Sequence, residues 1–496
     1  MARLCKYILA AFSLVVLPRV LAAQIAISDK EWNEDLVYLK EQILKTIPAV
    51  DENKLATDFD LLKIDFEKSN NSQKLMAIQK FLAGLNDEGN KLLPIQDAFD
   101  NAILPIKTYW FEDGLYVLDA IEQNKALINQ KITAINGVEI DTLYKIIAPY
   151  LSADNDNYLK YLYPFYVQNG LWLKGSGVLA ENANEVSITT EKEKTITVSF
   201  SDYSTYSQLK RELVGNTSDQ NYWKSYDAIT KTLTVQFQAI IDNEKGDNFS
   251  KFIKGIAKDL DSKKVDKLII DNRFGGGGNG FKLKSFTDIV RDNESINQRG
   301  KLFVLTSRAT RGTVMELTSI LELNTKAVII GEGTGEGPNS VGDIKVFELP
   351  NSKVKISLTH KFWPTTWSTD NRKELSPVVE TSYTSEKHLN KIDPWLVAIS
   401  TFKAEENYSK IPSELLKQLP GKYKVGENNI TIEENNGRLF LYMNRKMMSF
   451  FEIHSELYFK EDGELTTDID GVVLRYNTAN QKPKQLSWKG KTLTFQ

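Results

Sequence analysis

The part of the sequence best suited to chemistry is a run of four glycines: Gly275, Gly276, Gly277 and Gly278. The run follows Leu268-Ile-Ile-Asp271, an apolar segment typical of a buried strand, so it places bare backbone amides after a strand's carboxyl end. Amides in such a position stabilise an oxyanion or clamp an extended peptide. The alternative interpretation is a flexible turn before a helix, which has the same composition.

Histidine and cysteine are scarce. The 496 residues include one cysteine, Cys5, and three histidines: His360, His388 and His454. These counts argue against a zinc site of Cys and His and against a cysteine peptidase, and we expect neither metal nor cofactor. His360 follows the segment 355–359 and is the candidate histidine for a general base. The more ordinary interpretation is a hydrogen-bonded surface or cleft residue.

The glycine run lies in a segment that resembles a family signature. Asp271-Asn-Arg273-Phe-Gly275-Gly resembles the Asp-Leu-Arg-x-Asn-x-Gly-Gly motif of the tail-specific (C-terminal processing) serine peptidases of the S41, or tricorn-core, type, with Gly275 in place of Asn. The similarity continues in order and spacing through these segments: 81–87, 130–137, 304–310, 331–350 and 391–394. The resemblance implies the α/β protease core of this family, a PDZ-like β element, and serine-type proteolysis as the family's hydrolase activity.

The resemblance also indicates where the nucleophile belongs. The family's serine falls two residues after a Thr, and in Thr310-Arg-Gly312 that position is Gly312, which has no side chain. Thr313 is the fallback hydroxyl, but one helical step turns it by about 100°, so first-turn capping is its more ordinary role. Ser307, before the turn, is expected to make hydrogen bonds at a strand end.

The base positions are changed as well. Where one branch of the family has a Lys, this chain has Glu336, and where the other has a His, it has Gly89, or Asn90 if the register shifts by one. None of these can act as the missing amine or imidazole base, so we assign no catalytic residue and keep Thr313 only as the fallback. Glu316 and Glu332 are expected to be helix-face and loop carboxylates.

The surrounding pattern predicts the elements that hold these residues. Helical periodicity occupies 28–86, short strands follow over 104–140, and strands alternate with helices over 229–400, which is typical of a mainly parallel sheet with flanking helices. After 403, short alternating strands resemble the small antiparallel β-barrels of secreted hydrolases. The expected organisation is a signal peptide at 1–23, an N-terminal helical region at 24–103, a PDZ-like and mixed α+β region at 104–228, a protease-like core at 229–403, and a β-barrel at 411–496.

Charge and the first residues indicate the compartment. Lys+Arg number 62 and Asp+Glu 65, so the net charge is −3, which gives no broad basic face for nucleic acid. Arg3 and Lys6 precede an apolar run at 8–17 and small residues near 23, the pattern of a removable secretory signal. We therefore expect an exported, periplasmic or extracellular protein that has no stable membrane anchor after signal removal.

Three functions fit these observations. The first is a pseudopeptidase, a pseudoenzyme that binds a peptide or protein without cleaving it, because Gly312, Gly89 and Glu336 replace three catalytic groups. The second is a working serine-type peptidase with Thr313 or Ser307 as nucleophile. The third is a structural or interaction protein. Two aromatic clusters are candidates for a peptide cleft or for packing between domains: Phe362, Trp363 and Trp367, and Tyr161, Tyr163, Phe165 and Tyr166.

Overall fold

The computed structural model describes residues 27–495 except 68, 70, 94–101, 216–219, 244–247, 367–369, 405–409, 426–427, 445–451, 461–463, 468–472, 477–485 and 489–490. The expected signal peptide, at 1–23, lies outside the described residues. Among the helices that are described, none combines the length and apolar character that a membrane span requires.

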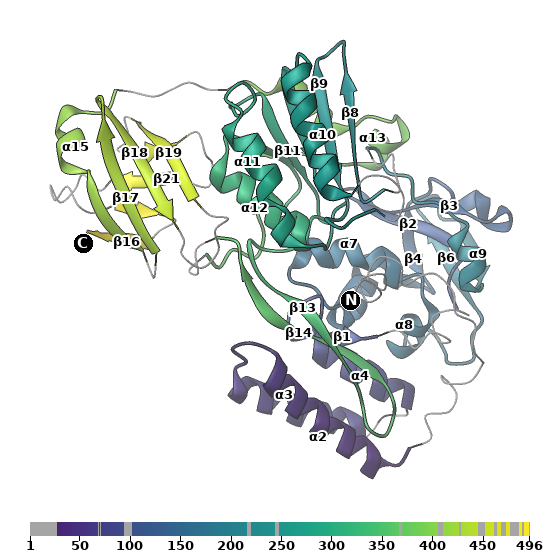
Figure 1. Ribbon diagram of the computed structural model, residues 1–496. Helices are drawn as coiled ribbons and strands as arrows, with labels where there is room; N and C mark the ends of the chain where they lie inside the picture. The colour runs from purple at the N-terminus through teal and green to yellow at the C-terminus, as the bar shows by residue number, and fades with distance from the viewer. Residues whose placement is uncertain are drawn as a thin grey trace.

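A six-stranded sheet forms the centre of the molecule (Figure 1). Its order is β15 (Val379–Glu380), β12 (Val328–Gly331), β11 (Leu302–Thr306), β10 (Lys267–Asp271), β9 (Thr232–Phe237) and β8 (Tyr222–Asp227). The pairs from β15 to β9 are parallel, and β8 pairs with β9 antiparallel. The predicted parallel strands are confirmed, within a mixed sheet.

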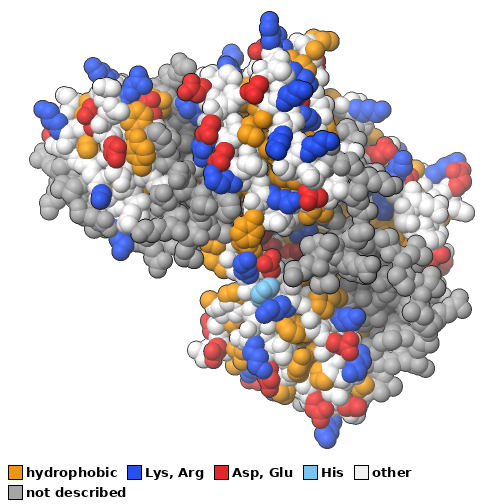
Figure 2. All heavy atoms as spheres, viewed as in Figure 1, with side chains coloured by type: hydrophobic (Ala, Val, Ile, Leu, Met, Phe, Trp, Pro, Cys, Tyr) orange, Lys and Arg blue, Asp and Glu red, His pale blue; other side chains and the backbone are white. Residues whose placement is uncertain are grey.

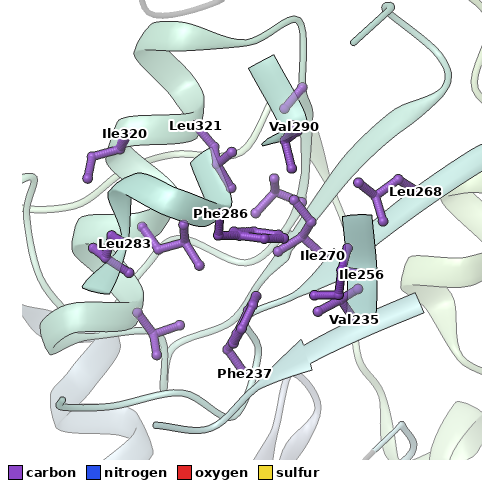
Figure 3. Packing of buried hydrophobic residues seen from close by; sticks show 14 of the residues in the cluster. Val235, Phe237, Ile256, Leu268, Ile270, Leu283, Phe286, Val290, Ile320 and Leu321 are labelled. Atoms are coloured by element: carbon purple, nitrogen blue, oxygen red, sulfur yellow. The ribbon is translucent and has the colours of Figure 1, made fainter. Parts of the chain in front are cut away.

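Helices cover this sheet because its strands are apolar on both faces. On one face, α10 (Phe249–Ser262), α11 (Lys284–Asp292) and α12 (Gly312–Asn324) bury a continuous core in which Phe286 packs among Phe237, Ile270 and Leu283 (Figure 3). The other face packs against α14 (Pro394–Thr401). Helix α12 is buried around nearly its whole circumference, so its N-terminus is fixed firmly.

A long hairpin leaves this core and reaches the N-terminal helices. Strands β13 (Asn339–Glu348) and β14 (Lys355–Pro364) pair along their whole length, and β1 (Lys91–Leu92) adds to β14. The far part of the hairpin packs against three helices: α2 (Asp29–Thr46), α3 (Glu52–Glu67) and α4 (Asn71–Ala83). Figure 2 shows hydrophobic side chains gathered where the hairpin leaves the core.

The region between these parts has its own small core. It contains two sheets, β2–β3 and β5–β4–β6–β7, and helices that pack on them. The strands are β2 (Ile106–Phe111), β3 (Gly114–Ala120), β4 (Ile132–Ile135), β5 (Val138–Glu139), β6 (Glu185–Thr190) and β7 (Thr195–Ser199). The helices are α6 (Ile140–Ile147), α7 (Asp156–Tyr166), α8 (Gly170–Gly175) and α9 (Tyr203–Ser207). Of these, α7 lies next to the core (Figure 1).

The C-terminal part is antiparallel and follows α15 (Ser413–Gln418). Its strands pair in chain order: β16 (Gly421–Val425), β17 (Asn428–Asn435), β18 (Arg438–Asn444), β19 (Glu452–Phe459), β20 (Glu464–Thr466), β21 (Val473–Tyr476), β22 (Leu486–Trp488) and β23 (Lys491–Phe495). Strand β23 pairs back onto β16, which closes the order. Leu323 of α12 joins the hydrophobic cluster of this part, so the core and the C-terminal strands are packed together.

Candidate functional site

Four segments that are far apart in the sequence meet at the N-terminus of α12. They are the segment 87–90, the glycine run 275–278, the helix start 311–313, and Glu336. Arg311 Nη1 lies 3.1 Å from Glu88 Oε2, and the Gly312 amide donates to the Glu336 carboxylate. The structure therefore brings together the positions that the sequence assigned to the nucleophile, the base and the amide donors.

Gly312 is a glycine for structural reasons. Its φ is +55°, the left-handed region that favours glycine. A Cβ at this position would lie 3.1 Å from both Cα and N of Gly277. The position assigned to the nucleophile thus faces the glycine run at close range and carries no side chain.

Glu336 occupies the place assigned to the family's lysine and binds the backbone there. Burial raises the pKa of its carboxyl, although hydrogen bonds from Ser340 and the Gly312 amide and the charge of Arg311 oppose that rise. A carboxylate at the start of a helix interacts favourably with its free amides. The side chain therefore serves as an anchor for the first turn of α12.

Gly89 and Asn90 are fixed against β14, which leaves no room for an imidazole. A Cβ on Gly89 would lie 2.3 Å from Thr359 Cγ2. The Asn90 side chain accepts hydrogen bonds from the Thr359 amide at 2.9 Å and from its hydroxyl at 3.2 Å. Ser357 Oγ donates to the Gly89 carbonyl at 2.7 Å. Both candidate base positions are therefore structural.

The glycine run is only partly free for a ligand. The amides of Gly275 and Gly276 donate to the carbonyls of Asn272 (3.3 Å) and Gln238 (2.9 Å). Gly275 cannot be the signature's Asn, because a Cβ would lie 2.4 Å from Val314 Cγ1. Among the described residues, the amides of Gly277 and Gly278 donate to no backbone carbonyl. A Cβ on Gly277 would meet nothing within 4 Å.

Opposite charges lie beside the helix start. Burial alone would raise the pKa of Glu88, but Arg311 and Lys91 outweigh it and lower that pKa to about 2. Lys91 Nζ lies 2.5 Å from Glu88 Oε1. The ionised Glu88 is thus held by two cations, and Arg311 also lies over the Tyr158 ring at 5.3 Å.

Other carboxyl groups near the helix start retain their protons more readily. Burial raises the pKa of Asp87 to about 7, assisted by the charges of Glu336 and Glu88 and opposed by the Gly89 amide and Thr359. Burial likewise raises the pKa of Asp154 well above its usual range, and Glu336 and Asp87 add to that rise. Burial raises the pKa of Glu316 to about 7. These groups can hold a proton near neutral pH, but the nucleophile position, Gly312, has no side chain to receive or donate one.

The two candidate hydroxyls differ in their surroundings. Ser307 Oγ donates to the Arg273 carbonyl at 2.5 Å and accepts from the Ala309 amide at 3.1 Å, as expected for a strand-end residue. Thr313 is the second residue of α12 and is buried. The N-cap, Arg311, makes no side-chain capping bond.

The remaining candidates lie in ordinary structural contacts. His360 Nδ1 is 2.6 Å from the Asp343 carbonyl across the β13–β14 hairpin, and Tyr383 Oη is 2.9 Å from His388 Nδ1. His454 belongs to β19. Glu332 forms an ion pair with Arg308 at 3.0 Å.

The aromatic clusters divide between packing and exposure. Tyr163 is fully buried, whereas Phe165 is 38% exposed and Phe362 46% exposed. Trp363 packs edge-on against Phe281, with centroids 6.0 Å apart. Trp367 lies outside the described residues.

Arg311, Asp154 and Tyr158 belong to the site but were not predicted. Tyr158 lies in the first turn of α7, which follows the Asn155 cap, and that cap was the one sequence signal that could have placed a helix end here.

The fold is similar to that of known proteases. Mature CPAF complexed with lactacystin is 12% identical and aligns with a TM-score of 0.54 over 75% of this chain and 98% of CPAF. The crystal structure of a CPAF mutant is 11% identical, with a TM-score of 0.52 over 76% and 99%. This chain has the tail-specific, S41-type protease fold. The photosystem II D1 C-terminal processing protease also aligns, at 14% identity and a TM-score of 0.37 over 72% and 94%.

The sequence itself matches no family model, and no curated protein matches it either. The TM-scores of 0.52 and 0.54 to CPAF show the fold of this chain, and at 11–12% identity they show the fold alone.

Proposed function

We propose that this protein is an exported, catalytically impaired pseudopeptidase that binds a peptide or protein ligand at the N-terminus of α12. The observation that carries the proposal is the Gly312 position, which has no hydroxyl and whose amide is bound by Glu336. A serine-type peptidase needs a nucleophile and a base beside it. Here the base positions are a carboxyl group, Glu336, and the tightly packed Gly89 and Asn90.

The binding function rests on the amides that stay free. Among the described residues, the amides of Gly277 and Gly278 donate to no backbone carbonyl, and the space beside Gly277 is open, whereas Gly278 packs against Ile240. Extended peptides are commonly held through such main-chain donors. We assign the ligand-binding role to this pair within the run 275–278. The segment 1–23 would direct export, and the C-terminal strands would form a non-catalytic module.

Peptide binding can be tested by closing the open space. Fluorescence anisotropy with a labelled peptide library should give measurable affinities, and Gly277→Phe should abolish them by filling the space over the amides. Ile229→Phe, at a turn residue that is 93% exposed, adds the same ring elsewhere and should leave binding intact. Absence of binding to any peptide would favour the structural role, and binding that survives Gly277→Phe would place the ligand elsewhere.

The absence of cleavage is tested separately. A fluorophosphonate probe should not label the protein, and casein and peptide libraries should remain intact. Turnover that disappears in Thr313→Val would overturn the proposal in favour of a working peptidase with an unusual nucleophile.

The expected export signal is tested by N-terminal sequencing of protein recovered outside the cytoplasm, with cleavage after residue 23 as the expected result.

A further inference from the structure

One cation of the described residues has buried donors without hydrogen-bond partners, and it lies at the end of α7 that is farther from the candidate site. Arg211, in the segment after α9, has a buried Nε and a buried Nη2 that donate to no acceptor. Its guanidinium lies 3.7 Å from the centroid of the Phe165 ring. A buried cation without a hydrogen-bonded partner is costly, and a structure that retains one offers those donors to an anion.

A second cation lies beside Arg211. Lys107 of β2 has its Nζ 3.2 Å from the Tyr206 ring centroid, and among the described residues neither cation forms an ion pair with a carboxylate. Burial, together with the charge of Arg211, lowers the pKa of Lys107 to about 8. The two positive groups therefore share one environment and destabilise each other.

The nearest carboxylate is already engaged. Asp119 pairs across the β2–β3 sheet with Lys107, and its charge acts on the lysine. Its Oδ1 accepts from the Ala120 amide and its Oδ2 accepts from the Lys210 amide, both at 2.8 Å. The second of these bonds holds the segment that carries Arg211 against β3. The phenols of Tyr206, Tyr161 and Tyr109 are the other titratable groups near the guanidinium.

Helix α7 connects this place with the candidate site. Tyr158, Tyr161 and Phe165 form one stripe, with centroids 5.6 Å and 5.4 Å apart along it. Arg311 lies over the first ring of the stripe and Arg211 over the last. Seven residues of helix span about 10 Å, which is the length of about three residues of extended peptide.

We propose that Arg211 and Lys107 form a subsite for the carboxylate of an acidic side chain of a peptide, about three extended residues along the α7 stripe from Arg311 at the candidate site. This proposal builds on the peptide-binding function. The rings of Phe165 and Tyr206 hold the two cations in place, and the carboxylate would accept from the donors that Arg211 leaves unmatched.

The decisive comparison uses peptides that carry Glu or Gln at each position in turn. In anisotropy measurements, Glu at one position should bind about tenfold more tightly than Gln, as expected for a charge-assisted hydrogen bond. Arg211→Gln should remove this preference, and Lys107→Gln should reduce it. Lys210→Gln makes the same charge change at the adjacent, exposed residue and should preserve the preference. A preference that is unchanged in Arg211→Gln would overturn the proposal.

A small probe separates this proposal from the peptide-binding function. Phenylacetate carries a carboxylate and a ring, and ligand-observed NMR should detect its binding to the wild type and its loss in Arg211→Gln. If no peptide binds but phenylacetate still depends on Arg211, the peptide-binding function fails and the subsite stands. If phenylacetate ignores Arg211 and peptides show no Arg211-dependent preference, the subsite is wrong.

Stability gives a third readout. Arg211→Met keeps a chain over Phe165 but removes the unmatched charge, so the ligand-free Tm should rise while phenylacetate no longer raises it. A lower Tm for Arg211→Met would indicate that the guanidinium is a structural cation and would contradict the proposal.

Discussion

At the residue scale, the position assigned to the nucleophile is one where the backbone conformation and the packing both favour glycine. Gly312 has a left-handed φ of +55°, and a Cβ there would lie 3.1 Å from Gly277. Glu336 then uses the Gly312 amide, and Thr359 fills the space where Gly89 would need a side chain. Each of these positions makes a structural contact that a catalytic side chain there would have to displace.

Gly312→Ala and Gly312→Ser should therefore destabilise the protein without creating activity. A positive φ and a 3.1 Å contact together predict a loss of about 1–3 kcal/mol in the free energy of unfolding, measured by denaturant titration. Gly177→Ala is the control, because Gly177 has φ +77° and nothing within 4 Å of a Cβ. Its loss should be smaller, since it reports backbone strain alone. Equal losses, or cleavage by Gly312→Ser, would contradict this account.

Asp87 should make the protein less stable as the pH rises. Its pKa is raised to about 7 in the folded state, so the folded state binds more protons than the unfolded state between about pH 4 and pH 7, and stability falls across that range. Asp87→Asn, which cannot ionise, should flatten the fall in Tm between pH 5 and pH 7. Asp141→Asn, at the first turn of α6, is the control and should leave the slope unchanged.

The sequence predicted which positions would be altered but not what surrounds them. Gly312, Glu336 and Gly89 were found because their motifs lie in a recognisable order. Asp154 and Arg311 could not be found in this way, because what makes them notable is burial next to other charges, and that follows only from packing.

At the scale of elements, one side chain both caps α7 and ties it to neighbouring loops. Asn155 accepts from the Tyr158 amide at 2.9 Å, which caps the helix. Its Nδ2 donates to the carbonyls of Thr334 at 3.0 Å and Lys373 at 2.7 Å. The helix is thereby tied to the loop that carries Glu336.

Asn155→Asp should separate these two roles. Aspartate is as good an N-cap as asparagine, but it has no donor and would face two carbonyl oxygens. We expect a loss of about 2–3 kcal/mol in chemical denaturation, from two bonds that are lost and acceptors that are left unmatched. Asn248→Asp, at the exposed N-cap of α10, is the matched change and should be near neutral. Similar effects at both positions would show that Asn155 acts only as a cap.

The elements also show where prediction from sequence succeeds. The apolar segments at 268–271, 302–306 and 327–330 predicted buried strands, and these lie at the centre of the sheet. The reach of the β13–β14 hairpin was not predicted. Apolar and polar residues alternate along its strands as in ordinary strands. Its length is understood only from the structure, where Ile356 and Leu358 pack against α2–α4.

At the scale of the whole molecule, this hairpin connects the core to the N-terminal helices. Asp35 of α2 is fully buried and accepts from the amides of Asn351 and Ser352, each at 2.8 Å, at the tip of the hairpin. A carboxylate that receives two amide bonds in a buried place holds the two parts in one arrangement.

Asp35→Ala should loosen this connection. Loss of two bonds to a charged acceptor predicts a decrease of about 3–5 kcal/mol in stability and faster amide exchange at Asn351 and Ser352, measured by hydrogen exchange. Glu34→Ala removes the neighbouring carboxylate, whose bond to Asn351 Nδ2 is exposed, and should change little. Unchanged exchange in Asp35→Ala would mean that other contacts hold the hairpin.

The close packing around Gly312 and Gly89 also limits which substitutions could introduce a catalytic residue during evolution. A serine introduced at 312 would meet Gly277, and a histidine at 89 would meet Thr359, so each single step toward a cutting enzyme disrupts packing before any activity is gained. Reversal would require several coordinated substitutions at once. Under the proposed function, evolution toward new ligands therefore requires fewer simultaneous substitutions than a return to proteolysis.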